Sequence, residues 1–133
     1  EAPALLARAG TVCNLLPGAA LTLRLRRPDA RALIAAGCTV ALGTDCNPGS
    51  SLCESQALMM SLGVLEHGLY VDEAWRAVTR HAAQAIGVAD VGSLVPGSIA
   101  DFVIWQTADH REVPQHLGAN LVGSVHFADG RRR

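Results

Sequence analysis

The segment CTVALGTD at residues 38–45 constrains the fold most, because it is continuously apolar and then turns abruptly polar. A strand with one face in water alternates apolar and polar side chains, whereas a continuously apolar strand is typical of parallel sheets covered on both faces. The segment TVCNLLP at residues 11–17 is a second apolar run. Between the two, residues 28–36 have the early proline and following Gly37 of a short helix. The order strand, helix, strand predicts a βαβ unit and an α/β fold.

A longer helix is predicted after residue 50. Ser51 and Glu54 have the spacing of a capping box, in which each side chain binds a backbone N–H at the helix start. Apolar residues then recur at helical spacing until Gly68 ends the pattern. Because Met59 and Met60 lie within this pattern, we expect both in the core.

A second helix is predicted over residues 71–87. It has acidic residues in its first turn and a terminal Gly87. Its apolar stripe consists of Ala74, Val78, Ala82 and either Ala85 or Ile86. We expect both helices to pack on the outside of a sheet.

The sequence changes character near residue 92. Two glycine turns precede a strand predicted over residues 100–106, and residues 121–133 predict a further strand that ends in a turn. We therefore divide the chain into an α/β part, residues 1–92, and a small β part, residues 93–133. Since the chain begins with Glu1 and not with Met, we expect it to be part of a longer protein.

The composition excludes several classes of function. The formal net charge is −1, so no long-range field favours nucleic acid or an anionic membrane. All 11 basic residues are arginine, which excludes lysine nucleophiles from this segment. We find neither a signal-peptide pattern nor the roughly 20 apolar residues of a membrane span. No C-x-x-C pair occurs among the cysteines, which we expect to be free thiols in a reducing cytoplasm.

Asp45 is the candidate functional residue. In α/β sheets and barrels, functional residues follow the carboxyl ends of the strands, and Asp45 closes the apolar run at residues 38–45. A carboxylate at the end of a buried strand is unfavourable unless something positive meets it, and a metal ion is a common solution. Spacing alone leaves the alternative, that Asp45 caps the loop or the next helix, equally open.

Four segments carry a resemblance to a known family. VALGTDCNPGSS, at residues 40–51, resembles the eighth-strand motif of imidazolonepropionases in the amidohydrolase superfamily. LLPGAALTLR, at residues 15–24, is similar to the seventh-strand region of that family. AVTRHAAQAIG and GSLVPGSIADFVIW, at residues 77–87 and 92–105, resemble the closing helix and the return into a β-sandwich. The resemblance implies the last two β/α units of a (β/α)8 barrel plus the returning strands of a small β-sandwich.

The resemblance also implies an activity, which is ring opening of 4-imidazolone-5-propanoate to N-formimidoyl-L-glutamate in histidine degradation. One divalent metal ion, zinc or iron, is implied, with Asp45 as one of its ligands and as the catalytic proton acceptor. The implied substrate-binding residues are Asn47, Gly49 and Ser50. We expect a small-molecule substrate, a homodimer for the full-length protein and no activity from this chain alone, because a full barrel needs about 250 residues.

Other residues and alternatives weigh less. His81 stands where the family often has Asn, and Ser50 where Thr is frequent, so the subfamily assignment is weakened. Asp101 is similar to a superfamily Asp that we expect to stabilise a turn by a hydrogen bond. The histidines show no H-x-H or H-x-x-x-H spacing, and we assign none of them to a site. The alternatives are another amidohydrolase that acts on a cyclic amide or deaminates an aminopurine or pyrimidine, and a non-catalytic α/β module.

Overall fold

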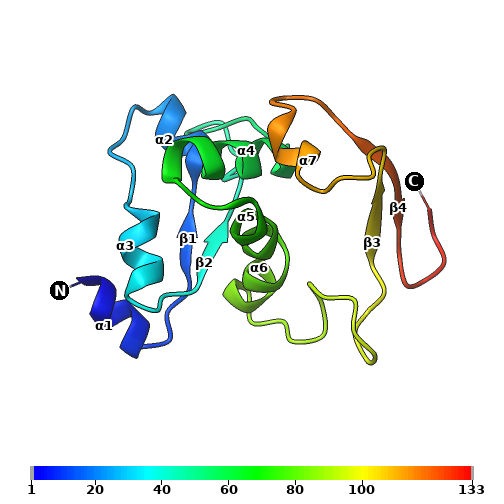
Figure 1. Cartoon of the computed structure of the whole chain (residues 1–133), viewed down its shortest axis with the longest axis horizontal. Helices are drawn as coiled ribbons and strands as arrows, with labels where there is room; N and C mark the ends of the chain where they lie inside the picture. Colours follow the sequence, from blue (N-terminus) through cyan, green and yellow to red (C-terminus); the bar gives the residue numbers. More distant parts are fainter. Residues whose placement is uncertain (1, 133) are drawn as a thin grey trace.

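The computed structural model describes residues 2–132, so Glu1 and Arg133, which the two predicted parts include, lie outside the described residues. Figure 1 shows two groups of elements, one around strands β1 and β2 and one around the pair β3 and β4. In chain order the elements are α1 (Ala2–Arg8), β1 (Cys13–Leu15), α2 (Pro17–Thr22), α3 (Ala30–Ala35), β2 (Val40–Leu42), α4 (Gln56–His67), α5 (Val71–Val78), α6 (Arg80–Ala85), β3 (Phe102–Trp105), α7 (Glu112–Gln115) and β4 (Val122–His126).

The predicted strand, helix, strand unit is confirmed. β1 and β2 are parallel, with Cys13 opposite Val40 and Leu15 opposite Leu42, and α3 lies between them in sequence. The side chain of Asp29 accepts a hydrogen bond from the backbone N–H of Ala32 at the start of α3, because the first N–H groups of a helix have no partner within it.

The core lies on one side of this strand pair. Leu15, Val40 and Leu42 are buried against apolar residues of the surrounding helices. Met59 and Met60 of α4 are 0% and 1% exposed, as predicted from the helical pattern. The turn after α4 brings Leu69 to the same cluster, and the covering helices bring Ala30, Leu33, Ile34, Val64, Ala74, Ala77 and Val78. This packing places the carboxyl ends of β1 and β2 beside the start of α4.

The predicted capping box is wrong. α4 begins at Gln56, and its N-cap is Ser55, whose side chain accepts from the backbone N–H of Leu58. Ser51 is buried and exchanges backbone hydrogen bonds with Asn47 instead. Residues 51–54 therefore complete the loop after β2 before the helix starts. Gly68 ends α4 in the left-handed conformation, as expected.

The single helix predicted over residues 71–87 is divided at Thr79, where the backbone leaves the helical region with φ −121° and ψ −96°. The Thr79 hydroxyl donates to the carbonyl oxygen of Trp75, and a Cβ at Gly92 would lie 2.8 Å from the Thr79 carbonyl oxygen. The loop that contains Gly92 thus packs against the helix break at Thr79. The predicted stripe is confirmed in α5, where Ala74 is buried and Val78 packs against the core. It is wrong in α6, where Ala83 is buried while Ala85 and Ile86 are exposed.

The two strands predicted after residue 92 are confirmed as the antiparallel pair β3 and β4, with Phe102 opposite His126. The Asp101 carboxylate accepts a hydrogen bond from the backbone N–H of Ala128, 2.8 Å away, and so stabilises the turn after β4 as predicted. Trp105 of β3 meets Trp75 of α5 edge to face, with ring centroids 5.5 Å apart.

Three helices were not predicted from the sequence. These are α1, α2 and α7. Pro17 was interpreted as a strand end, and it is also the first residue of α2, a position at which proline is favoured because its missing N–H is not needed. None of the helices in the described part of the chain has the length and apolarity needed to cross a membrane. The four cysteines are free thiols, as expected.

Candidate functional site

The candidate site is the loop that follows β2. Leu42 ends β2, and Asp45 follows three residues later with a half-buried side chain. The backbone of Asp45 is left-handed, with φ +49°. Most residues other than glycine avoid this conformation, but Asp and Asn adopt it more readily because their short polar side chains bond locally. The chain therefore turns sharply at the residue predicted to be functional.

Hydrogen bonds within the loop hold Asp45. The Ser50 hydroxyl donates to Asp45 Oδ2 at 2.5 Å, and the Asn47 amide donates to the Ser50 hydroxyl and to the Asp45 carbonyl oxygen, each at 2.8 Å. Asn47 Oδ1 accepts from the backbone N–H groups of Gly49 and Ser50 at 2.9 and 3.1 Å. All four predicted site residues thus lie in one loop. The side chains of Asn47 and Ser50 form their hydrogen bonds with other residues of this loop.

The orientation of the Asp45 carboxylate leaves one oxygen available. Oδ2 is bound by Ser50, whereas Oδ1 has no hydrogen-bond partner among residues 2–132. Of the alternative that Asp45 caps the loop or the next helix, the helix part is wrong because Ser55 caps α4, whereas Asp45 does accept a hydrogen bond within the loop, from Ser50. The described residues contain no group of three or more His, Cys, Asp or Glu side chains that could hold a metal ion. A metal ion held by Asp45 would therefore need further ligands from outside the described residues.

Two side chains form hydrogen bonds with backbone carbonyl groups of β2. Backbone groups of β2 alternate in direction, and Gly43 N–H donates toward β1, to Leu15 O at 3.0 Å. The carbonyl oxygens of Val40 and Leu42 accept from side chains instead, from His81 Nδ1 at 2.9 Å and Gln56 Nε2 at 2.8 Å. His81, which departs from the family pattern, thus bonds to backbone and contributes to no ligand cluster.

Gln56 and Asn14 also lie near this loop and were not among the predicted site residues. Gln56 carries no distinguishing signal, because its role depends on where α4 starts relative to β2. Asn14 does carry one, since it is the polar residue within the apolar run at residues 11–17. The structure places Asn14 on β1 beside Gly43, where a Cβ would lie 2.9 Å from Asn14 Nδ2.

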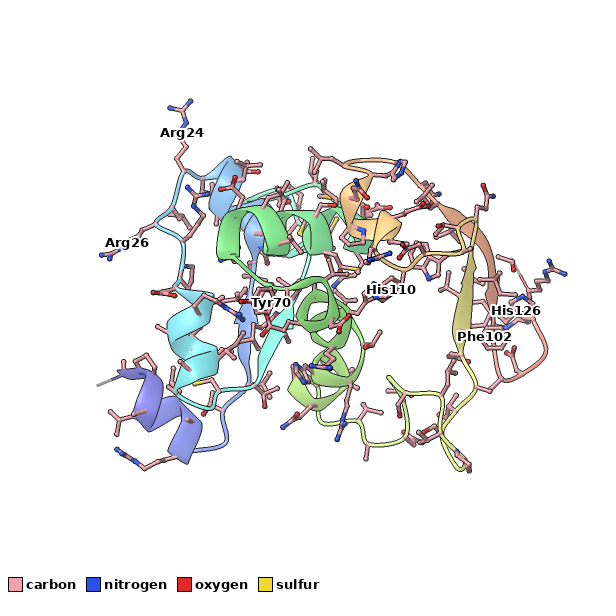
Figure 2. The ribbon with its side chains drawn as sticks, in the orientation of Figure 1. Arg24, Arg26, Tyr70, Phe102, His110 and His126 are labelled. Atoms are coloured by element: carbon pink, nitrogen blue, oxygen red, sulfur yellow. The ribbon has the colours of Figure 1, made fainter. Side chains whose placement is uncertain are left out.

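His67 and His126 make local contacts, and neither joins a metal-ligand cluster within the described residues. His67 is buried at the end of α4, where burial lowers its pKa, and its Nδ1 lies 3.3 Å from Pro28 O. His126 stacks on Phe102 with ring centroids 4.7 Å apart (Figure 2). Four arginines lie close together in the sequence, namely Arg24, Arg26, Arg27 and Arg31. Arg24 and Arg26 extend away from the fold (Figure 2), while the other two pair with carboxylates. These pairs are Arg27 with Glu66 and Arg31 with Glu73.

Sequence comparison gives two findings. The profile of the amidohydrolase family matches residues 3–127. An imidazolonepropionase from Streptomyces coelicolor is 45% identical over 120 residues, which are 90% of this chain and 31% of that protein. One from Geobacillus kaustophilus is 47% identical over 121 residues, or 90% of this chain and 28% of that protein. The chain therefore spans about 30% of the length of the curated relatives that it matches.

Structure comparison finds the same fold in several hydrolases. A triazine hydrolase variant superposes with a TM-score of 0.80 and 22% identity, covering 96% of this chain and 32% of that one. Escherichia coli guanine deaminase gives a TM-score of 0.78 and 21% identity over 98% of this chain and 35% of its own. A zinc complex of atrazine chlorohydrolase from Arthrobacter aurescens gives a TM-score of 0.75 and 21% identity, covering 96% of this chain and 32% of that one.

Proposed function

The chain belongs to the amidohydrolase family, and we propose that it is the C-terminal part of an imidazolonepropionase. The reaction is hydrolytic ring opening of 4-imidazolone-5-propanoate to N-formimidoyl-L-glutamate. The observation that supports this substrate over others is the likeness to imidazolonepropionases at 45–47% identity across nine-tenths of the chain. The triazine hydrolases and guanine deaminase share only the fold, at 21–22% identity.

The proposal includes the division of the chain. Residues 1–92 form the last two β/α units of a (β/α)8 barrel, and residues 93–133 are returning strands of a small β-sandwich. The parallel pair of β1 and β2, covered by helices on one side, supports the first part, and the antiparallel pair of β3 and β4 supports the second.

A single divalent metal ion, zinc or iron, is part of the proposal. The residues present fit it to the extent of one ligand, because Asp45 is half-buried at the carboxyl end of β2 and its Oδ1 is free of hydrogen bonds within the described part of the chain. When bound, a divalent ion in such a site polarises the scissile carbonyl and makes water a nucleophile at neutral pH.

The chain's own residues have distinct roles in this proposal. Asp45 accepts the proton of the attacking water at its carboxylate and delivers it to the leaving ring nitrogen. Ser50 orients that carboxylate through its hydrogen bond to Oδ2, and Asn47 orients the Ser50 hydroxyl. Contacts of Asn47, Gly49 and Ser50 with the substrate are proposed on the family likeness.

The test is an assay of the full-length protein that contains this chain. Ring opening of 4-imidazolone-5-propanoate is expected, with no turnover of guanine or cytosine. The variant Asp45→Asn keeps the size of the side chain and its tolerance of a positive φ, but it removes the proton acceptor, so we expect kcat to fall by about 100-fold or more. Turnover of guanine without turnover of the imidazolone would refute the proposed substrate, and an active Asp45→Asn variant would refute the proposed role of Asp45.

A further inference from the structure

Asn14 is a polar side chain in a strand whose neighbours are apolar. Leu15 is 3% exposed and packs in the core, whereas Asn14 is exposed. Because successive side chains of a strand point to opposite faces, Asn14 lies on the face of the sheet away from the helical core. The apolar core therefore does not explain why this residue is polar.

The carboxamide of Asn14 lies at the same end of the sheet as the Asp45 loop. Asn14 is paired with Ala41 of β2, and strand side chains lean along the strand. A Cβ at Gly43 would lie 2.9 Å from Asn14 Nδ2 and 3.3 Å from Oδ1, so the amide group occupies the space that a side chain at Gly43 would need. Gly43 precedes Asp45 by two residues.

Three other polar side chains around this end of β2 are already engaged. Gln56 donates to Leu42 O, and Asn47 and Ser50 bind within the loop. The Asn14 side chain, by contrast, makes no hydrogen bond to any residue in the range 2–132. A primary amide offers two donors and two acceptor lone pairs, and it is costly to cover without partners. Asn14 is thus an exposed polar group on this face that makes no side-chain hydrogen bond within the described residues.

We propose that Asn14 is a substrate-contacting residue that recognises the amide group of a cyclic amide ring. This inference rests on the proposed function and adds a specificity determinant to the same site. The N–H and C=O of a ring amide lie side by side in the cis arrangement, and a carboxamide presents one acceptor and one donor with matching spacing. Asn14 therefore forms a two-point hydrogen bond with the ring, next to the carboxylate of Asp45.

The test compares variants of the full-length protein on two substrates. Asn14→Leu keeps the approximate size and removes both hydrogen bonds, and Asn14→Ala provides a second variant should the first fail to fold. On the imidazolone substrate we expect kcat/KM to fall by about three- to tenfold, mainly through KM. On an analogue methylated at the ring amide nitrogen, the variant should lose less than on the imidazolone, because methylation removes the N–H donor of one of the two hydrogen bonds. A matched control, Thr11→Val, changes an exposed residue just before β1 and should behave as wild type on both.

Two results would overturn the inference. One is an unchanged KM in both Asn14 variants, and the other is an equal loss on both substrates, which a purely structural role of Asn14 would cause. Should the full-length protein fail to hydrolyse the imidazolone, the proposed substrate is wrong, and hydantoin then serves as a simple cyclic amide probe. Thermal stabilisation of wild type by hydantoin that is lost in Asn14→Leu supports the contact, whereas equal stabilisation of both proteins refutes it.

Discussion

Removing the Ser50 hydroxyl is expected to impair the proposed enzyme without unfolding it. In the structure this hydroxyl donates to Asp45 Oδ2 at 2.5 Å and accepts from the Asn47 amide at 2.8 Å. The variant Ser50→Ala deletes both bonds and a longer one to the Asp45 carbonyl oxygen at 3.3 Å, and it leaves the backbone hydrogen bonds between Asn47 and Ser51 in place. The loop should therefore persist while the Asp45 carboxylate loses its only bonded side-chain partner among the described residues.

The magnitude follows from the type of bond. Hydrogen bonds to charged groups contribute about 1.5–3 kcal/mol, and the half-buried position of Asp45 and Ser50 favours the lower end of this range. If this energy is used to hold the carboxylate in its reactive orientation, a loss of about 1.5 kcal/mol lowers kcat/KM by about tenfold. Full detachment of Asp45 would have a much larger effect.

The assay measures kcat/KM of the full-length protein for 4-imidazolone-5-propanoate, together with the midpoint of thermal unfolding and the metal content. Ser50→Thr is the matched control, because it keeps the hydroxyl and should retain most of the activity. Two outcomes contradict the reasoning. One is a Ser50→Ala variant within about twofold of wild type, and the other is a Ser50→Thr variant that is as impaired as Ser50→Ala.

Two further predictions concern stability. Met60 is 1% exposed, so Met60→Ala should lower the free energy of unfolding by about 2–5 kcal/mol in denaturant titration of the full-length protein, whereas Leu65→Ala, on the same helix but 67% exposed, should change it by about 0.5 kcal/mol or less. Burial lowers the pKa of His67 below its ordinary value of 6.5, so the unfolded chain takes up the proton more readily and stability falls as the pH drops below about 6.5. Thermal unfolding midpoints from about pH 7.5 to about pH 5.5 should therefore fall less in His67→Gln than in wild type, and the exposed control His116→Gln should fall as wild type does; equal pH dependence in all three proteins would contradict this role of His67.

The sequence by itself determined the order of the main elements and the position of the candidate site. Apolar runs at residues 11–17 and 38–45 predicted two parallel strands, since such runs are typical of the buried strands of parallel sheets. The same pattern placed Asp45 at a strand end, where polar groups of neighbouring strands meet. These features depend on neighbours along the chain, and such patterns can be recognised in the sequence.

The tertiary structure decided what depends on contacts between distant residues. The spacing of Ser51 and Glu54 predicted a cap at Ser51, whereas in the folded chain α4 begins four residues later, with Ser55 as its cap. The helix break at Thr79 is packed against Gly92, thirteen residues further on. Asn14 is adjacent to Gly43 only because β1 and β2 pair in one register. Each of these outcomes depends on which side chains share a small space after folding, and no local sequence pattern contains that information.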